Sequence, residues 1–77
     1  MVLNVSISSP PDREYLVADI MLDDSLQIAE VNIESGTLEI EIYEHPERIP
    51  WSLDFEEFYT AMKQAKLSLQ EVYEKND

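Results

Sequence analysis

Residues 37–43 read Thr-Leu-Glu-Ile-Glu-Ile-Tyr, and this stretch decides the fold class. Aliphatic side chains alternate with polar or acidic ones, so one face of an extended strand is apolar and the other is wet. A strand that is buried on both faces is instead apolar throughout. The alternation therefore predicts an antiparallel sheet of which only one face is covered.

Three stretches before this one show the same two-residue period. We expect strands at about residues 2–8, 14–22 and 26–33, in addition to 37–43, because breaks rich in proline, serine and aspartate separate them. The only glycine, Gly36, is expected to close the last hairpin, since such a turn requires a positive φ that glycine adopts without strain.

Residues 55–74 carry apolar side chains at steps of three and four, which is typical of an amphipathic helix. Asp54 is a favourable N-cap, and Glu57 three positions later completes a capping box. The expected apolar stripe consists of Phe55, Phe58, Tyr59, Met62, Ala65, Leu69, Val72 and Tyr73.

One amphipathic helix has one stripe to bury, and a small sheet needs a cover to be stable. We therefore predict a single α+β domain over residues 1–77. Its expected architecture is an antiparallel meander of three or four strands, with one C-terminal helix packed on one face.

The charge of the chain limits its partners. Seventeen acidic residues against five basic ones give a formal net charge of −12. Nucleic acid and anionic membranes would add negative charge to a negative surface, so neither is expected to bind. A basic protein is the natural complement. The absence of cysteine and of an apolar run of about 18–20 residues favours a cytoplasmic protein.

The uncovered face of the sheet is the first candidate binding surface. Strand alternation is expected to point four carboxylates away from the helix into solvent, with two tyrosines among them. These residues are Asp19, Glu30, Glu39 and Glu41, together with Tyr15 and Tyr43. The face is either a solvated surface whose charge prevents edge-to-edge aggregation, or an acidic patch that docks a basic partner.

Trp51, in the loop before the helix, is the second candidate. It either packs over the end of the core with its indole N–H on a carbonyl or water, or serves as an exposed interface anchor.

The sequence offers no catalytic or cofactor motif. His45 is the only histidine, and no nucleophile lies near it in the sequence. The spacing of a calcium-binding loop is absent, and zinc would lack both cysteine and a second histidine. We expect a protein that is not an enzyme and has no metal or cofactor.

The run from Thr37 to Tyr43, then Pro50-Trp51, then the segment at residues 54–58, resembles small acidic bacterial proteins that include immunity proteins of toxin systems. The resemblance spans roughly residues 13–70. It implies an immunity or antitoxin protein that inhibits a basic toxin such as a nuclease. Two alternatives stay open: a homo-oligomeric structural module, including a homodimer, and a binder of a cation or small ligand.

Overall fold

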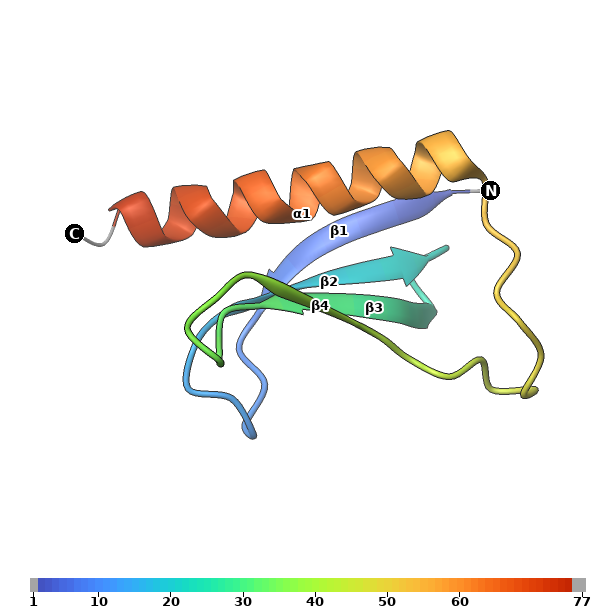
Figure 1. The fold of residues 1–77 in the computed structure, drawn as a ribbon, viewed down its shortest axis with the longest axis horizontal. Helices are drawn as coiled ribbons and strands as arrows, with labels where there is room; N and C mark the ends of the chain where they lie inside the picture. Colours follow the sequence, from blue (N-terminus) through green and yellow to red (C-terminus); the bar gives the residue numbers. More distant parts are fainter. Residues whose placement is uncertain (1, 76–77) are drawn as a thin grey trace.

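The computed structural model describes residues 2–75, and the side chains of residues 2–73. It contains four strands followed by one helix (Figure 1). The elements are β1 (Leu3–Ser8), β2 (Val17–Leu22), β3 (Leu26–Asn32), β4 (Glu39–Ile42) and α1 (Phe55–Lys75). The sheet order is β1-β2-β3-β4, and each neighbouring pair is antiparallel. The predicted α+β meander with one C-terminal helix is confirmed.

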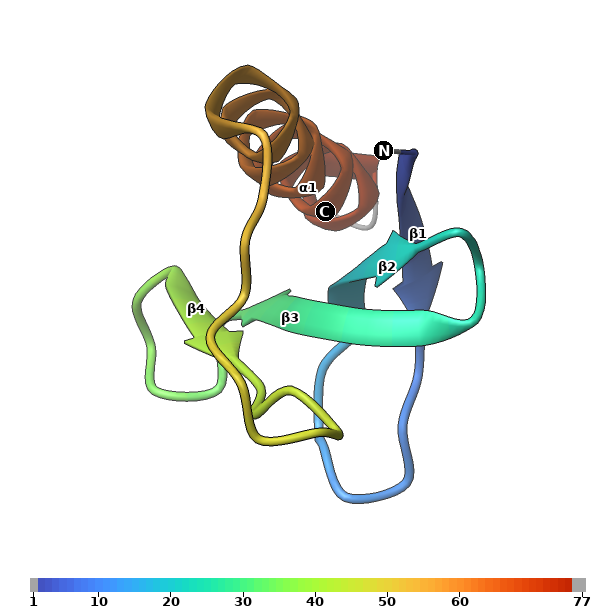
Figure 2. The same ribbon diagram turned by 90° about the vertical axis from the view of Figure 1, so that its right-hand side faces the viewer.

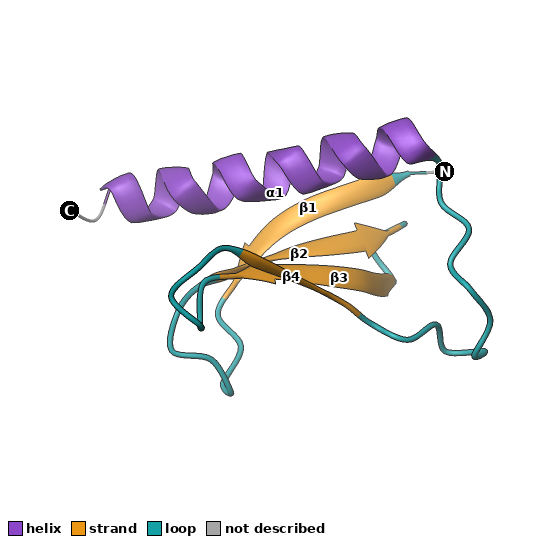
Figure 3. Ribbon diagram, viewed as in Figure 1, coloured by secondary structure: helices purple, strands orange, loops and turns teal. Residues whose placement is uncertain are grey.

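The helix forms one layer and the sheet the other (Figure 3). Helix α1 packs against β1 and β2, reaches β3, and does not reach β4, so its cover of the sheet is lopsided (Figure 2). The core lies between the two layers. Its buried side chains are Ala18, Ile20, Ile28, Ala29, Val31, Ala61, Ala65 and Leu69.

The helix faces the sheet with most of the expected stripe: Ala65 and Leu69 are in the core, and Phe58, Met62 and Tyr73 pack against it. Ala61, Ala65 and Leu69, at four-residue spacing, are buried. The expectation is wrong for Phe55 and Tyr59, which are 77% and 50% exposed and stack on each other with ring centroids 6.5 Å apart. Alanine lets the helix backbone approach the sheet closely, so the line that starts at Ala61 takes the centre and the bulky rings are displaced to the side.

Two strands are shorter than the alternation indicates. The strand expected from residue 14 begins at Val17, and the one expected from residue 37 begins at Glu39. In both cases a backbone amide just before the strand donates to a side chain: the Thr37 amide donates to the Ser35 hydroxyl at 3.5 Å. The Glu14 amide donates to a carboxylate oxygen of Glu34 at 2.6 Å. Hydrogen bonds from the loop backbone to side chains therefore replace strand pairing just before β2 and β4.

Both predicted local signals at the turns are present. Gly36 has a φ of 93°, as the hairpin requires. Asp54 caps the helix, because its carboxylate accepts the Glu57 amide hydrogen at 2.9 Å.

The turn between β2 and β3 suggests a stabilising substitution. Asp23 and Asp24 have φ values of 52° and 62°, a left-handed pair in which the second position favours glycine. We expect Asp24→Gly to raise the free energy of unfolding by about 0.5 kcal/mol, because relief of strain outweighs the added freedom of the unfolded chain. Urea denaturation measures this. Asp24→Ala is the control: it removes the same carboxylate but keeps Cβ, and a gain equal to that of glycine would contradict the strain explanation.

Candidate interaction site on the helix-free face

Strand register places three carboxylates in a row on the face opposite the helix. Asp19 of β2 pairs with Glu30 of β3, and Glu30 pairs with Glu41 of β4. The next residue along each strand points to the other face, as Ile20 and Val31 do when they enter the core under α1. We call Asp19, Glu30 and Glu41 the carboxylate row.

Arg13 lies against the centre of this row. It belongs to the β1–β2 connection, which hangs below the sheet on the side away from α1 (Figure 2). Its Nη2 atom is 2.9 Å from a carboxylate oxygen of Glu30 and also donates a hydrogen bond to Glu41. The protein's own cation thus neutralises part of the row.

Glu30 does not face solvent, so that expectation is wrong. The residue is 4% exposed, because the β1–β2 connection brings Arg13 across it. The buried amide of Asn32 donates to Glu30 at 3.0 Å and to Glu41 at 2.9 Å, and the Tyr43 hydroxyl donates to Glu30 at 3.3 Å. Glu30 is the hub of a polar network, in keeping with the rule that a buried charge is paired and hydrogen-bonded.

Burial raises the pKa of Glu30 above its ordinary value, and the nearby charge of Glu41 acts in the same direction. The Arg13 guanidinium and the Asn32 amide lower the pKa of Glu30, but they offset the effect of burial only in part. Burial also raises the pKa of Tyr43, helped by the negative charge of Glu30. The Tyr43 hydroxyl therefore stays protonated and acts as a donor.

The outer carboxylates are better placed to meet a partner. Glu39 and Glu41 are exposed, and Asp19 is half-buried. Serine and glutamine side chains hold two of them: Ser8 and Gln27 donate to Asp19 at 2.6 and 2.8 Å, while Ser35 donates to Glu39 at 2.7 Å. Together with Glu30 these make four carboxylates against one guanidinium, so the face keeps a surplus of negative charge.

The structure brings only one of the three aromatic candidates into this network. Tyr43, 37% exposed, reaches Glu30. Tyr15 instead packs edge-on against Tyr73 of α1, with ring centroids 6.2 Å apart. Trp51 is half-buried against the core, and its indole N–H donates to the Tyr43 carbonyl at 2.7 Å, as the first of its two interpretations predicts.

Arg13 is the functional residue that the sequence reasoning missed. It is the only basic residue before Arg48, in a segment that contains most of the sheet's carboxylates. A lone cation among so many acids is a signal that it has a carboxylate partner. Which carboxylate it meets depends on how the β1–β2 connection folds back, and that is a tertiary feature.

No other feature of the described residues indicates chemistry. They contain no group of three or more histidine, aspartate or glutamate side chains arranged to hold a metal ion. His45 accepts the Glu47 amide hydrogen and lies against Trp51, with ring centroids 4.6 Å apart. Over residues 2–75, helix α1 lacks the length of apolar sequence that a bilayer crossing requires.

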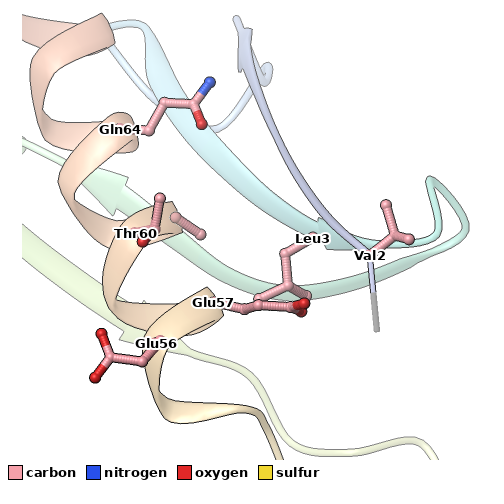
Figure 4. Close-up of a pocket in the computed structure, with 7 residues that line it drawn as sticks. Val2, Leu3, Glu56, Glu57, Thr60 and Gln64 are labelled. Carbon is pink, nitrogen blue, oxygen red and sulfur yellow. The ribbon is translucent and has the colours of Figure 1, made fainter.

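An open hollow of about 400 Å³ lies between the start of β1 and the first turns of α1 (Figure 4). Glu57 and Leu3 approach each other there, while Glu56 points away. The polar side chains that line it are Glu56, Glu57, Thr60 and Gln64.

Comparisons with protein-family models, with curated proteins and with solved structures found no match to this chain.

Proposed function

We propose that this chain is a non-enzymatic protein-interaction domain of the immunity or antitoxin kind, which inhibits a basic partner protein such as a toxin nuclease. The observation that supports it is the helix-free face, where four carboxylates lie together and Arg13 pairs with two of them. We place its action in the cytoplasm, since the chain has no cysteine to cross-link.

The arrangement suits electrostatic docking. The surplus negative charge attracts a cationic surface and speeds encounter, while the exposed Glu39 and Glu41 form the charge pairs. The Arg13–Glu30 contact fixes the side chains of the row before the partner arrives, which lowers the entropy cost of binding. Tyr43, beside Glu41 on the edge of the sheet, supplies an aromatic contact.

Affinity capture from the source cells tests this function. The wild-type domain on a resin is expected to retain a basic protein at low salt and release it as the salt rises, because screening weakens exposed charge pairs. The variant Glu39→Gln/Glu41→Gln is expected to lose that protein. The matched control is Glu47→Gln/Glu56→Gln, which removes the same charge from exposed positions elsewhere and should retain it.

Two results would count against the proposed function. One is that no basic protein is retained by the wild type. The other is that the Glu39→Gln/Glu41→Gln variant and its control retain the same protein equally well. Binding would then depend on the overall charge of the protein and not on this face.

A further inference from the structure

The sheet has room for a second helix. Neighbouring strands lie about 4.8 Å apart and a helix with its side chains is about 10 Å across, so four strands accommodate two helices side by side. Helix α1 packs on β1, β2 and part of β3, and leaves β4 bare on the same face (Figure 2).

The uncovered part is an apolar groove between α1 and β4, with a volume of about 400 Å³. Val31 of β3, Leu38 and Ile40 contribute from the sheet side, and Tyr59 and Met62 contribute from α1. Leu38, Ile40 and Tyr59 are 42%, 39% and 50% exposed. Contiguous exposed apolar side chains of this kind mark binding surfaces.

The charge at the groove is opposite to that of the protein as a whole. Lys63 and Lys66, two of the chain's five basic residues, line it from α1, against one lining carboxylate, that of Glu39. Among the residues whose side chains the structure describes, no carboxylate lies within ion-pair distance of either ammonium. An occupant with carboxylates on its α1 side would satisfy both lysines.

We propose that this groove binds an amphipathic helix of another protein, with an apolar stripe on β3 and β4 and acidic side chains against Lys63 and Lys66. Such a helix lies beside α1 and completes the cover of the sheet. The site is on the opposite face from the carboxylate row and takes a ligand of opposite charge. It shares one residue with the function proposed above, Glu39, which also lines this groove.

A second copy of this chain fits the groove less well. The exposed large apolar side chains of α1 are Phe55, Tyr59 and Leu67 over residues 55–73, and Lys63 interrupts the line between Tyr59 and Leu67, so the exposed side of the helix offers no continuous apolar stripe. Two copies joined along β4 would bring Glu39 and Glu41 of both chains together, and like charges across strands are destabilising.

The probe is an 18-residue helical peptide with leucines at three- and four-residue spacing and glutamates on both flanks. A second peptide carries lysine in place of each glutamate. Methyl NMR of the labelled protein is expected to show shifts at Leu38, Ile40 and Met62 with the glutamate peptide. The lysine peptide is expected to perturb the carboxylate-row face instead.

Variants separate the contributions of shape and charge. Ile40→Ser is expected to lower the affinity for the glutamate peptide by about tenfold, since it removes roughly half of the transfer free energy of a buried aliphatic side chain. Lys63→Glu/Lys66→Glu is expected to lower this affinity by a similar factor. Two controls lie outside the groove: Leu67→Ser, and Arg48→Glu, which reverses one exposed charge. Both variants should bind the glutamate peptide with an affinity within about twofold of wild type.

Any of four results would overturn this proposal. The groove methyl groups stay unshifted by the glutamate peptide, or they respond equally to both peptides. The bound peptide adds to the β4 edge as a strand, seen as shifts confined to the β4 amides. Alternatively, sedimentation shows a dimer of the free wild-type protein that Ile40→Ser abolishes, which would make a second copy the occupant.

Discussion

Replacing Arg13 with methionine is expected to lower the melting temperature by roughly 10 °C at pH 7, which is large for a domain of this size. Arg13 is the only cation within ion-pair distance of Glu30 among the described residues. Glu30 is 4% exposed, so the substitution leaves a buried carboxylate beside Glu41 without a counter-charge. Methionine keeps much of the arginine stem's volume, so the loss reports charge more than packing.

A double-mutant cycle identifies the cause of the loss. Arg13→Met/Glu30→Gln is expected to recover most of the lost stability, because a neutral amide needs no cation. Arg48→Met is the matched control, since Arg48 is exposed in a loop, and it should change the melting temperature by less than about 3 °C. Equal losses from Arg13→Met and Arg48→Met would contradict the buried pair.

The pH dependence of the loss has a definite sign. Because burial raises the pKa of Glu30 in the folded protein, the folded state favours the protonated carboxyl. The stabilising contribution of Glu30 is therefore complete below its ordinary pKa of 4.5, and is lost as the pH rises through the folded value. The penalty of Arg13→Met should shrink as the pH falls towards 4.5, where a neutral Glu30 needs no partner.

Leu69→Ala is expected to lower the free energy of unfolding by about 3 kcal/mol, the cost of a lost side chain plus the cavity it leaves. Leu69 is 1% exposed, and it is the largest side chain that α1 buries completely. Urea denaturation with a fixed m-value measures the change. In a domain of 77 residues this is a large part of the total stability.

Leu67→Ala is the matched control, because Leu67 lies two positions away on the same helix and is 57% exposed. It is expected to change stability by less than about 0.5 kcal/mol. If the two alanine variants are destabilised equally, α1 does not face the sheet through Ala61, Ala65 and Leu69.

The elements with local signals could be predicted from the sequence. The alternation in residues 37–43 predicted a strand of an antiparallel sheet, which the structure confirms from Glu39 to Ile42, although both faces of that strand are exposed. Asp54 and Gly36 mark a helix start and a turn through the chemistry of single residues. Such signals involve only residues that are close in the sequence, so they can be recognised without knowledge of the tertiary fold.

The rotation of the helix could not be predicted in the same way. The predicted stripe contained both Leu69, which is buried, and the pair Phe55 and Tyr59, which is exposed, and it left out the buried Ala61. Hydrophobicity favours the aromatic pair, but the closeness of the sheet selects the alanine. The choice depends on the partner surface, which the helix sequence does not contain.

The candidate site was predicted in part for a similar reason. Strand period placed Asp19, Glu30 and Glu41 on one face, which the register confirms. The period does not show that a loop returns across that face, so the burial of Glu30 and the role of Arg13 were missed. It also does not show that one helix covers only half of a four-stranded sheet.

The most direct test of how the helix-free face is organised is the pH titration of the Glu30 side chain, followed by carbon NMR of its carboxyl group. We predict a midpoint above 4.5, and a further rise in Arg13→Met, since both burial and the loss of the guanidinium disfavour the ionised form. A midpoint at or below 4.5, unchanged by Arg13→Met, would show that Glu30 is solvated and that Arg13 does not lie against it.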